Sequence, residues 1–331
     1  MNDGMTPKVS VIICTYNQKT KIARALKSVL ASDGFAPGEM EVIVADDAST
    51  DGTAEAATEA AGGDGRVRVI KREGNLGLVR NYFAALKEAR GEYIADVAGD
   101  DAWTSITRLA RSADILDNNP GITMVHTGWT EVDEATGKRR ERGARNVAGT
   151  ARERLLNLLE RKDGACPHLS TTLYRKPVID KAREEHPELF DSERLACEDM
   201  QVLAFLLTQG DAAYIDETTL DYTVEPGTVS VPNSARKAAK FYCGVVWLME
   251  KLRGIEGIDR RELMEYYNGA ARYAAGMARR ERDAESARKI KETWGELGIR
   301  MPAVARLNLW LARISAARGA CGNTPRGGCG C

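Results

Sequence analysis

The first 130 residues alternate short β-rich runs with stretches whose apolar residues recur at helical spacing, and this alternation constrains the fold more than any other feature. It is typical of βαβ units that build a parallel sheet. The runs expected to form strands are 9–13, 41–45, 67–70, 93–97 and 122–125. Because the crossovers are right-handed, the carboxyl ends of the strands gather on one edge. We therefore predict an α/β fold with a mostly parallel central sheet, flanking helices and a ligand site at that edge.

The rest of the chain changes character twice. Residues 130–162 are polar and charged, which predicts an exposed loop, and short strands near 173–174, 212–215 and 219–224 then accompany a helix at 199–207. Beyond residue 234 the pattern predicts three or four amphipathic helices, and the Gly- and Cys-rich end cannot build a core. We expect four regions in all. They are a nucleotide-binding half at about 7–128 and an acceptor half at about 129–232 of one domain, a helical region at 233–318 and a flexible tail at 319–331.

Composition and charge limit the classes of function. Lys and Arg number 47 against 48 Asp and Glu, so a net charge of −1 gives no overall attraction to nucleic acid. The amino-terminal residues lack an apolar run long enough for a signal peptide or a spanning helix, which indicates a cytoplasmic protein. The helix expected at 303–318 has apolar residues on one side, arginines and no acidic residue. Contact with an anionic membrane is one interpretation, and docking onto the main domain is the favoured one.

Polar clusters follow four of the predicted strands, at 14–18, 46–53, 74–81 and 98–103. Asp46 and Asp47 end an apolar strand, so their carboxylates are placed to accept hydrogen bonds from a ribose or a base. Asp100 and Asp101 set two like charges at a strand end, which is costly unless a cation or solvent neutralises them. Carboxylate oxygens suit Mg²⁺ or Mn²⁺, and such an ion bridges a diphosphate. The alternative is a helix N-cap, for which one aspartate would be enough.

In order and spacing, these motifs resemble family 2 glycosyltransferases. The residues that carry the resemblance are Val9-Ser10-Val11-Ile12-Ile13, Thr15-Tyr16-Asn17, Asp46-Asp47-Ala48-Ser49-Thr50-Asp51-Gly52-Thr53, Asn75-Leu76-Gly77, Arg80-Asn81 and Gly91-Glu92-Tyr93-Ile94-Ala95. The stretch Gly99-Asp100-Asp101-Ala102-Trp103 is similar to the subgroup whose metal motif ends in Gly-Asp-Asp-x-Trp. The resemblance extends to about residue 230. It implies a GT-A fold and an inverting transferase that uses a nucleotide-activated sugar, first of all a UDP-sugar, and a divalent metal.

The resemblance also implies roles for single residues. Those implied to bind the nucleotide-sugar are Thr15, Tyr16, Asn17, Asp46, Asp47, Asn75, Arg80, Gly99 and Asp100. Those implied to bind Mn²⁺ or Mg²⁺ are Asp100, Asp101 and Glu225. Asp199, in Cys197-Glu198-Asp199, would take the proton of the acceptor. On residue chemistry alone, a carboxylate at a helix start needs no catalytic role.

The chain departs from the family pattern at two positions. Ala98 stands where the metal motif is usually acidic, and Asp96 is expected to point to the opposite face of the sheet. Glu225 stands where the family often carries His, which keeps an oxygen ligand for a hard cation. These departures leave an inactive sugar-nucleotide-binding homologue as the serious alternative. A Rossmann oxidoreductase is disfavoured because no Gly-x-Gly-x-x-Gly follows the first strand.

Other residues carry weaker expectations. His126, His168 and His186 show no metal-ligand spacing, and Trp247, Trp294 and Trp310 fit helix packing, so we expect core or surface roles for all six. Cys321, Cys329 and Cys331 make a poor zinc site, although they suggest a thiol-bearing acceptor peptide as a speculative alternative. Family analogy implies polysaccharide or glycoconjugate assembly. The acceptor, whether a glycan, a lipid-linked sugar or a peptide, is not readable from the residues.

Overall fold

The computed structural model describes residues 6–145, 147–225 and 232–321, with side chains to residue 316. The chain divides into two compact units. The first takes in the described parts of Met1–Glu193, Cys197–Glu225 and Leu252–Ile258. The second takes in those of Arg194–Ala196, Pro226–Lys251 and Asp259–Cys331.

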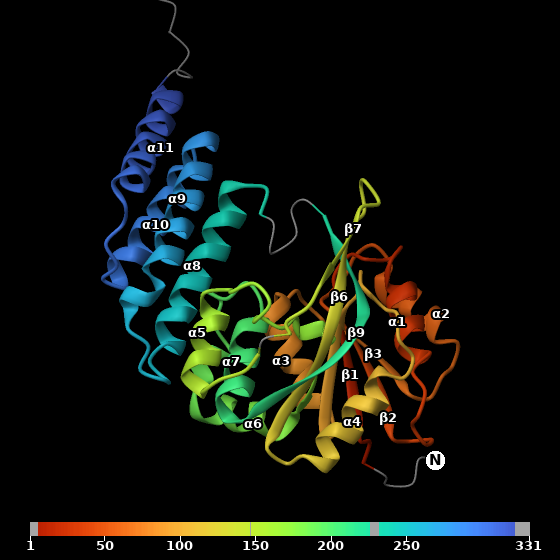
Figure 1. Ribbon diagram of the computed structural model, residues 1–331. Helices are drawn as coiled ribbons and strands as arrows, with labels where there is room; N and C mark the ends of the chain where they lie inside the picture. The colour runs from red at the N-terminus through yellow and green to blue at the C-terminus, as the bar shows by residue number, and fades with distance from the viewer. Residues whose placement is uncertain (1–5, 146, 226–231, 322–331) are drawn as a thin grey trace, which may run out of the picture. The chain divides into compact units, whose positions relative to one another are not determined.

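One nine-stranded sheet forms the frame of the first unit (Figure 1). Its strands are β1 (Val9–Thr15), β2 (Met40–Asp46), β3 (Val67–Lys71), β4 (Tyr93–Ala98), β5 (Ala102–Trp103), β6 (Ile122–Asp133), β7 (Arg139–Arg142), β8 (Leu173–Arg175) and β9 (Asp211–Val224). The order is β3-β2-β1-β4-β8-β6-β9-β5, with β7 paired to β6. Strands β1 to β4 are parallel, β8 is antiparallel to both of its neighbours, and β6 and β9 are parallel. This mixed, mostly parallel sheet confirms the predicted α/β class.

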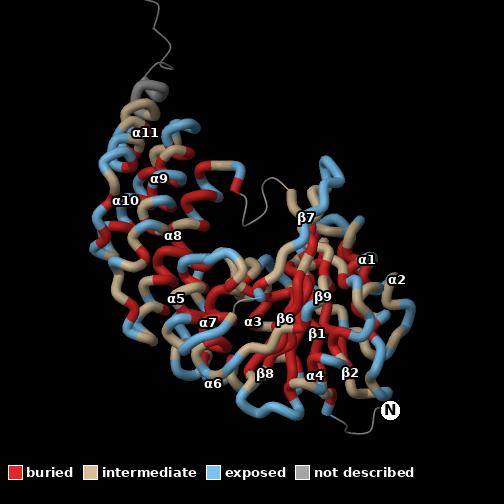
Figure 2. The backbone as a smooth tube through the Cα atoms, in the orientation of Figure 1, coloured by how far each residue is buried: buried red, intermediate tan, exposed pale blue. Residues whose placement is uncertain are grey.

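Helices cover both faces of this sheet. They are α1 (Ile22–Leu30), α2 (Thr53–Ala61), α3 (Leu78–Glu88), α4 (Arg108–Asn118), α5 (Ala151–Leu159), α6 (Lys176–Glu185) and α7 (Asp199–Gln209), with short 3₁₀ turns at Leu169–Thr171 and Pro187–Leu189. Alternate residues of β1 (Val9, Val11 and Ile13) pack with Ile22 and Leu26 of α1 in the main apolar core. Figure 2 shows the central strands buried, as expected for a sheet with helices on both faces.

The structure differs from the sequence prediction in the polar stretch 130–162. That stretch is not a loop throughout, because β6 continues to Asp133, pairs with β7, and is followed by α5. Helix α5 begins with a capping box in which Thr150 and Glu153 satisfy each other's backbone donors. The two short strands expected at 212–215 and 219–224 form one strand, β9, because shifts in its register with β6 absorb the irregularity between them.

The second unit is helical, as predicted. It consists of α8 (Ala235–Leu252, whose last residue belongs to the first unit), a 3₁₀ turn at Arg260–Leu263, α9 (Met264–Glu281), α10 (Ala284–Glu296) and α11 (Ala303–Cys321). Small buried residues on α9, such as Ala271 and Ala275, allow close packing against α11. Within the described residues, no helix is both long and apolar enough to cross a bilayer. The side chains of Cys321, Cys329 and Cys331 lie outside the described residues, so their predicted roles stay untested.

Candidate functional site

The loops that follow β1 and β2 are tied together at the carboxyl edge of the sheet. The Asn17 amide donates to the Ser49 hydroxyl (2.8 Å), and the Asn17 side-chain oxygen accepts from the Thr50 amide (3.0 Å). Asn17 and Ala48 have φ values of 53° and 60°, an uncommon backbone conformation for residues other than glycine. Strained backbone of this kind gathers where a ligand must be held. Beside these loops Tyr16 is 50% exposed, whereas Thr15 is buried.

Asp46 and Asp47 hold this loop cluster in shape. Asp46 is fully buried, and its two carboxylate oxygens accept from the amide and the hydroxyl of Ser49. Asp47 accepts the amides of Leu76 (2.7 Å) and Gly77 (2.9 Å), where α3 begins. Direct contact of both aspartates with a nucleotide was expected from the sequence. In this structure Asp46 holds the loop through Ser49, and the nucleotide contacts of Asp46 and Asp47 stay predictions.

Asn75 and Arg80 extend the same edge from the loop after β3. The Asn75 side-chain amide donates to the Asp47 carbonyl (3.1 Å), so the second and third loops are joined here as well. Arg80 donates to Asp191 (2.8 Å) and to Glu193 (3.0 Å), both of which are exposed. Exposed ion pairs of this kind contribute little to the stability of the fold, and their partners exchange readily. The predicted contact of Arg80 with base or phosphates would therefore require it to exchange these partners.

The end of β4 brings Asp100 to the same edge. Gly99 is required there, because a Cβ would lie 2.5 Å from the Gln18 side-chain oxygen and 2.7 Å from the Thr15 hydroxyl. The Asp100 backbone carbonyl accepts from Arg24, and burial raises the pKa of the Asp100 carboxyl. Burial disfavours the charged form of this carboxyl, and a divalent cation bound to it would favour the charged form. Asp100 therefore fits the predicted metal role.

The other two predicted metal ligands have different surroundings. Asp101 is 1% exposed, and one of its oxygens accepts the Thr223 amide (2.8 Å) while the other has no partner within the described part of the chain. Burial and the neighbouring Asp100 raise the pKa of the Asp101 carboxyl well above its ordinary value. Glu225 forms an ion pair with Lys21. Among the described residues, no three His, Cys, Asp or Glu side chains are grouped to hold an ion.

Three carboxyl groups meet where β4 faces the start of α7. Asp96 and Glu198 are 6% and 8% exposed, and each has a carboxyl oxygen without a hydrogen-bond partner among the described residues. Burial, followed by Asp199, raises the pKa of Asp96 to about 8, and the same two causes raise that of Glu198 well above its ordinary value. A pKa of about 8 keeps Asp96 mainly protonated at neutral pH, and the shift of Glu198 favours its protonated form in the same direction. Asp199 is the half-buried member of the group and keeps contact with solvent.

The position of Asp96 corrects a sequence expectation. Asp96 was expected to point to the opposite face if the strand continued. Strand β4 does continue to Ala98, but residues two apart in a strand share one face, so residues 96 and 98 lie on the same face. After burial, the charge of Asp199 is the next cause that raises the pKa of Asp96. The shared face of residues 96 and 98 could have been predicted from the sequence, because residues two apart in a strand lie on the same face.

The raised pKa of Asp96 makes a testable prediction about stability. Since its pKa of about 8 in the folded state lies above the ordinary 3.8, the folded state binds more protons between these values, and its stability falls as pH rises through this window. Asp96→Asn removes that penalty. At pH 8 we expect the variant to be more stable than the wild type by about 2 kcal/mol, so that it unfolds at a temperature roughly 4–8 °C higher. At pH 5 we expect a smaller increase in the unfolding temperature. Thermal melts at the two pH values measure this, with exposed Asp163→Asn as control, and an equal gain at both would contradict it.

An aromatic cluster stands beside Asp199. Its members come from β6, from the segment before the Leu169–Thr171 turn, and from β9. The Trp129 and His168 rings are 5.4 Å apart, and His168 lies 4.6 Å from Tyr222. Burial lowers the pKa of His168, while Asp199 and Glu131 oppose that effect. From the sequence, His168 was expected to have a core or surface role, and Trp129 was not singled out. The three rings come from separate segments, so no spacing in the sequence predicts that they meet.

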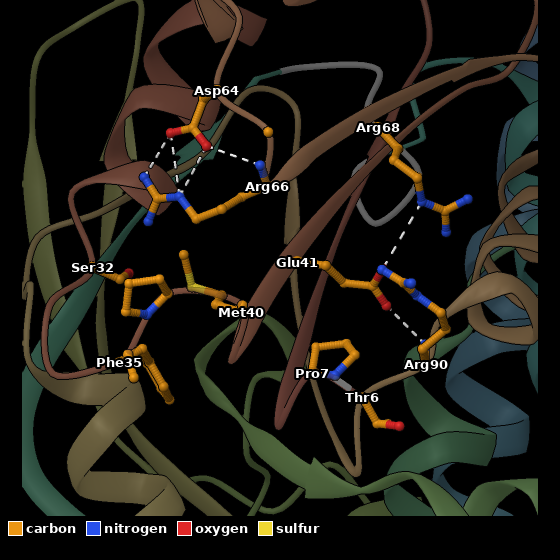
Figure 3. Close-up of a pocket in the computed structure, with 14 residues that line it drawn as sticks. Thr6, Pro7, Ser32, Phe35, Met40, Glu41, Asp64, Arg66, Arg68 and Arg90 are labelled. Carbon is orange, nitrogen blue, oxygen red and sulfur yellow. Dashed lines mark hydrogen bonds and ion pairs between the residues drawn. The ribbon is translucent and has the colours of Figure 1, made fainter. Parts of the chain in front are cut away.

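A cavity of about 750 Å³ lies at the other end of the strands, among residues that precede β1, β3 and β4 or begin β2 (Figure 3). Its arginines are already paired. Arg66 contacts both oxygens of Asp64, and Arg90 donates to Glu41 (2.7 Å). Arg68 also lies 3.9 Å from Glu41. A cavity with neutralised cations offers little attraction to a diphosphate, so the carboxyl edge remains the candidate site.

The family model for "Glycosyl transferase family 2" matches residues 10–182, which include every strand from β1 to β8 except the first residue of β1. The chain belongs to this family. The matched segment contains Asp46, Asp47 and Asp100, and it ends before Asp199.

Comparisons with individual proteins agree with this assignment. The chain is 38% identical over 97 residues to the putative teichuronic acid biosynthesis glycosyltransferase TuaG of Bacillus subtilis, covering 29% of this chain and 37% of TuaG. The chain spans about a third of the length of the first curated relatives that it matches.

Two solved structures share the fold. TarS 1-349 of S. aureus, in complex with UDP-GlcNAc, has a TM-score of 0.57 and 18% identity over 96% of this chain and 93% of that one. The mannosyltransferase PcManGT of Pyrobaculum calidifontis, in complex with GDP-Man and Mn²⁺, has a TM-score of 0.51 and 15% identity over 97% and 82%. At these identities the likeness shows the GT-A fold and no more.

Proposed function

We propose that this protein is an inverting hexosyltransferase that moves a sugar from a nucleotide-sugar, first of all a UDP-sugar, to a glycan, lipid-linked or peptide acceptor. The observation that carries the proposal is the pairing of two carboxylates in one unit. Asp100 follows β4 at the edge where the first three loops meet, and Asp199 begins α7 and acts electrostatically on Asp96 of that strand. In this proposal Asp100 holds a cation that neutralises the departing diphosphate, and Asp199 accepts the proton of the acceptor hydroxyl.

The chemistry needs only one displacement. Asp199 takes the proton of the acceptor hydroxyl, the acceptor oxygen bonds to the anomeric carbon, and the bond from that carbon to the donor phosphate breaks on the opposite side. The configuration at that carbon inverts because there is a single displacement. The raised pKa values of Asp96 and Glu198 favour their uncharged forms, which limits competition with Asp199 for the acceptor proton. Positioning carries much of the rate in such a scheme.

Asp100 is the residue that would hold the divalent metal, with oxygens of the donor diphosphate as further ligands. A bound Mn²⁺ or Mg²⁺ supplies charge neutralisation for the leaving diphosphate. Asp101 acts differently in this proposal, because its carboxyl holds the Thr223 amide of β9 and so fixes the turn that carries Asp100. Glu225 would join the metal only by leaving Lys21.

The acceptor side of the proposal rests on Trp129, His168 and Tyr222. Half-buried aromatic rings beside a few polar groups are the usual lining of a site for an organic ligand. They stand near Asp199, where the acceptor hydroxyl must lie. The relation to a teichuronic acid biosynthesis protein supports a polysaccharide or glycoconjugate product.

A binding protein without turnover is the second candidate, and Ala98 in the metal motif favours it. The test uses the full chain with UDP-, GDP- and dTDP-sugars, in Mn²⁺ or in EDTA, and measures free nucleotide. We expect release from one donor only when Mn²⁺ is present. Metal-dependent binding of a donor by calorimetry without release would support the binding protein, and neither binding nor release would overturn both.

A further inference from the structure

The second unit carries an apolar pocket of about 480 Å³ between α10 and α11. Its walls include Trp294, Ile299, Met301, Leu309 and Trp310. Trp294 is 1% exposed and anchors the floor, whereas Trp310 is 58% exposed at the rim. An apolar pocket with an exposed tryptophan at its mouth is poorly explained as packing within the unit.

Helix α11 continues this apolar surface along its outward side. Ala305, Leu309 and Ala312 face inward and are buried, so they account for packing onto α9 and α10. On the outward side, Val304 is 59% exposed and Leu307 is 52% exposed, each more than half open to solvent. The helix is thus apolar on both sides, which packing against α9 and α10 alone does not require.

Charge identifies what this surface would meet. Lys291, Arg300, Arg306 and Arg313 line the pocket, and no acidic residue does. The sequence shows the same bias, because Arg300, Arg306, Arg313, Arg318 and Arg326 follow Glu296 and no Asp or Glu does, although the chain as a whole has a net charge of −1. Apolar side chains flanked by cations are the pattern of helices that lie in the interface of an anionic bilayer. Binding to a neutral apolar partner would not explain why four cationic side chains line one pocket.

We propose that the α10–α11 surface, defined as the residues of this pocket with Val304 and Leu307, binds the surface of a membrane rich in anionic phospholipid. Trp310 and Leu307 would enter the interface at the level of the headgroups, and Arg306 and Arg313 would meet lipid phosphates. The proposal concerns the second unit alone and does not depend on the transfer reaction proposed above.

The test is cosedimentation of the full chain with vesicles. We expect binding to vesicles of phosphatidylcholine with phosphatidylglycerol, little binding to phosphatidylcholine alone, and release by salt. The double variant Arg306→Glu and Arg313→Glu should bind at least tenfold more weakly. Leu307→Ser with Trp310→Ser should weaken binding as well, which simple charge attraction would not predict.

The matched control is Arg272→Glu with Arg288→Glu, which makes the same charge change at exposed positions of α9 and α10 outside the pocket. It should bind like the wild type, and circular dichroism should show all variants folded. Equal weakening by the control pair, or no binding to anionic vesicles, would overturn the proposal. A lipid-free dimer that the Leu307 and Trp310 variant abolishes would also overturn it and assign the surface to a second copy of the chain. Metal-dependent nucleotide release should be unchanged in every variant, which separates this test from that of the proposed function.

Discussion

Asp199→Asn should reduce sugar transfer by about 10²–10⁴-fold and leave donor binding near the wild-type level. The amide has nearly the shape of the carboxylate, but it cannot accept the proton of the acceptor. Asp199 begins α7 and is half-buried, so the change removes a basic group without emptying a core position. Donor binding depends on residues of other loops and should persist. Transfer to an acceptor and donor affinity, measured separately, distinguish the two effects.

The neighbouring Glu198 gives a matched control for this experiment. Burial and nearby carboxyls raise the pKa of Glu198 well above its ordinary value, which favours the uncharged carboxyl that glutamine resembles. Glu198→Gln should therefore keep most of the transfer activity. A loss in Glu198→Gln with activity retained in Asp199→Asn would contradict the assignment and make Glu198 the base.

The strands of the parallel half were predictable because apolar runs and helical spacing are local signals. Strand β4, for example, was expected at 93–97 and runs over Tyr93–Ala98. Strand β9 was expected as two strands, since the polar residues near Asp216 resemble a turn. Only its pairing with β6, with shifts of register near Gly128, shows that the strand continues. Pairing over such distances leaves no local trace in the sequence.

The candidate site was predictable as a set of loops but not as a set of contacts. The positions of Asp46 and Asp47 at the end of a strand predicted the edge of the sheet at which the loops after β1, β2 and β3 are joined. That Asp47 caps the start of α3 through Leu76 and Gly77 depends on how two loops fold together. The aromatic cluster at His168 likewise exists only after three distant segments meet. Burial, which sets the protonation of Asp96 and Glu198, is a property of the assembled unit rather than of a motif.

Asp100→Asn should lower metal-dependent nucleotide release by about 10²–10³-fold, because metal neutralisation of a leaving group is worth several kcal/mol. The amide keeps the shape at the end of β4 but loses the charge that attracts a divalent cation. The midpoint of a Mn²⁺ titration should move to higher concentration in the same variant. Asp101→Asn should shift that midpoint less, since the Asp101 carboxyl is buried against β9.

The complementary change restores an acid where the chain lacks one. Ala98→Asp should lower the Mn²⁺ concentration needed for half-maximal release, because it places a second carboxylate beside Asp100 on a half-buried position. Circular dichroism would show whether both variants stay folded. Release that is equal in Mn²⁺ and in EDTA, for the wild type and for Asp100→Asn alike, would contradict the metal role.

Neutralisation of the diphosphate would then fall to the cations that act on Asp100, which are Lys21 and Arg24. Since Arg24 already donates to the Asp100 carbonyl, Arg24→Gln would be the variant that decides between cation and metal.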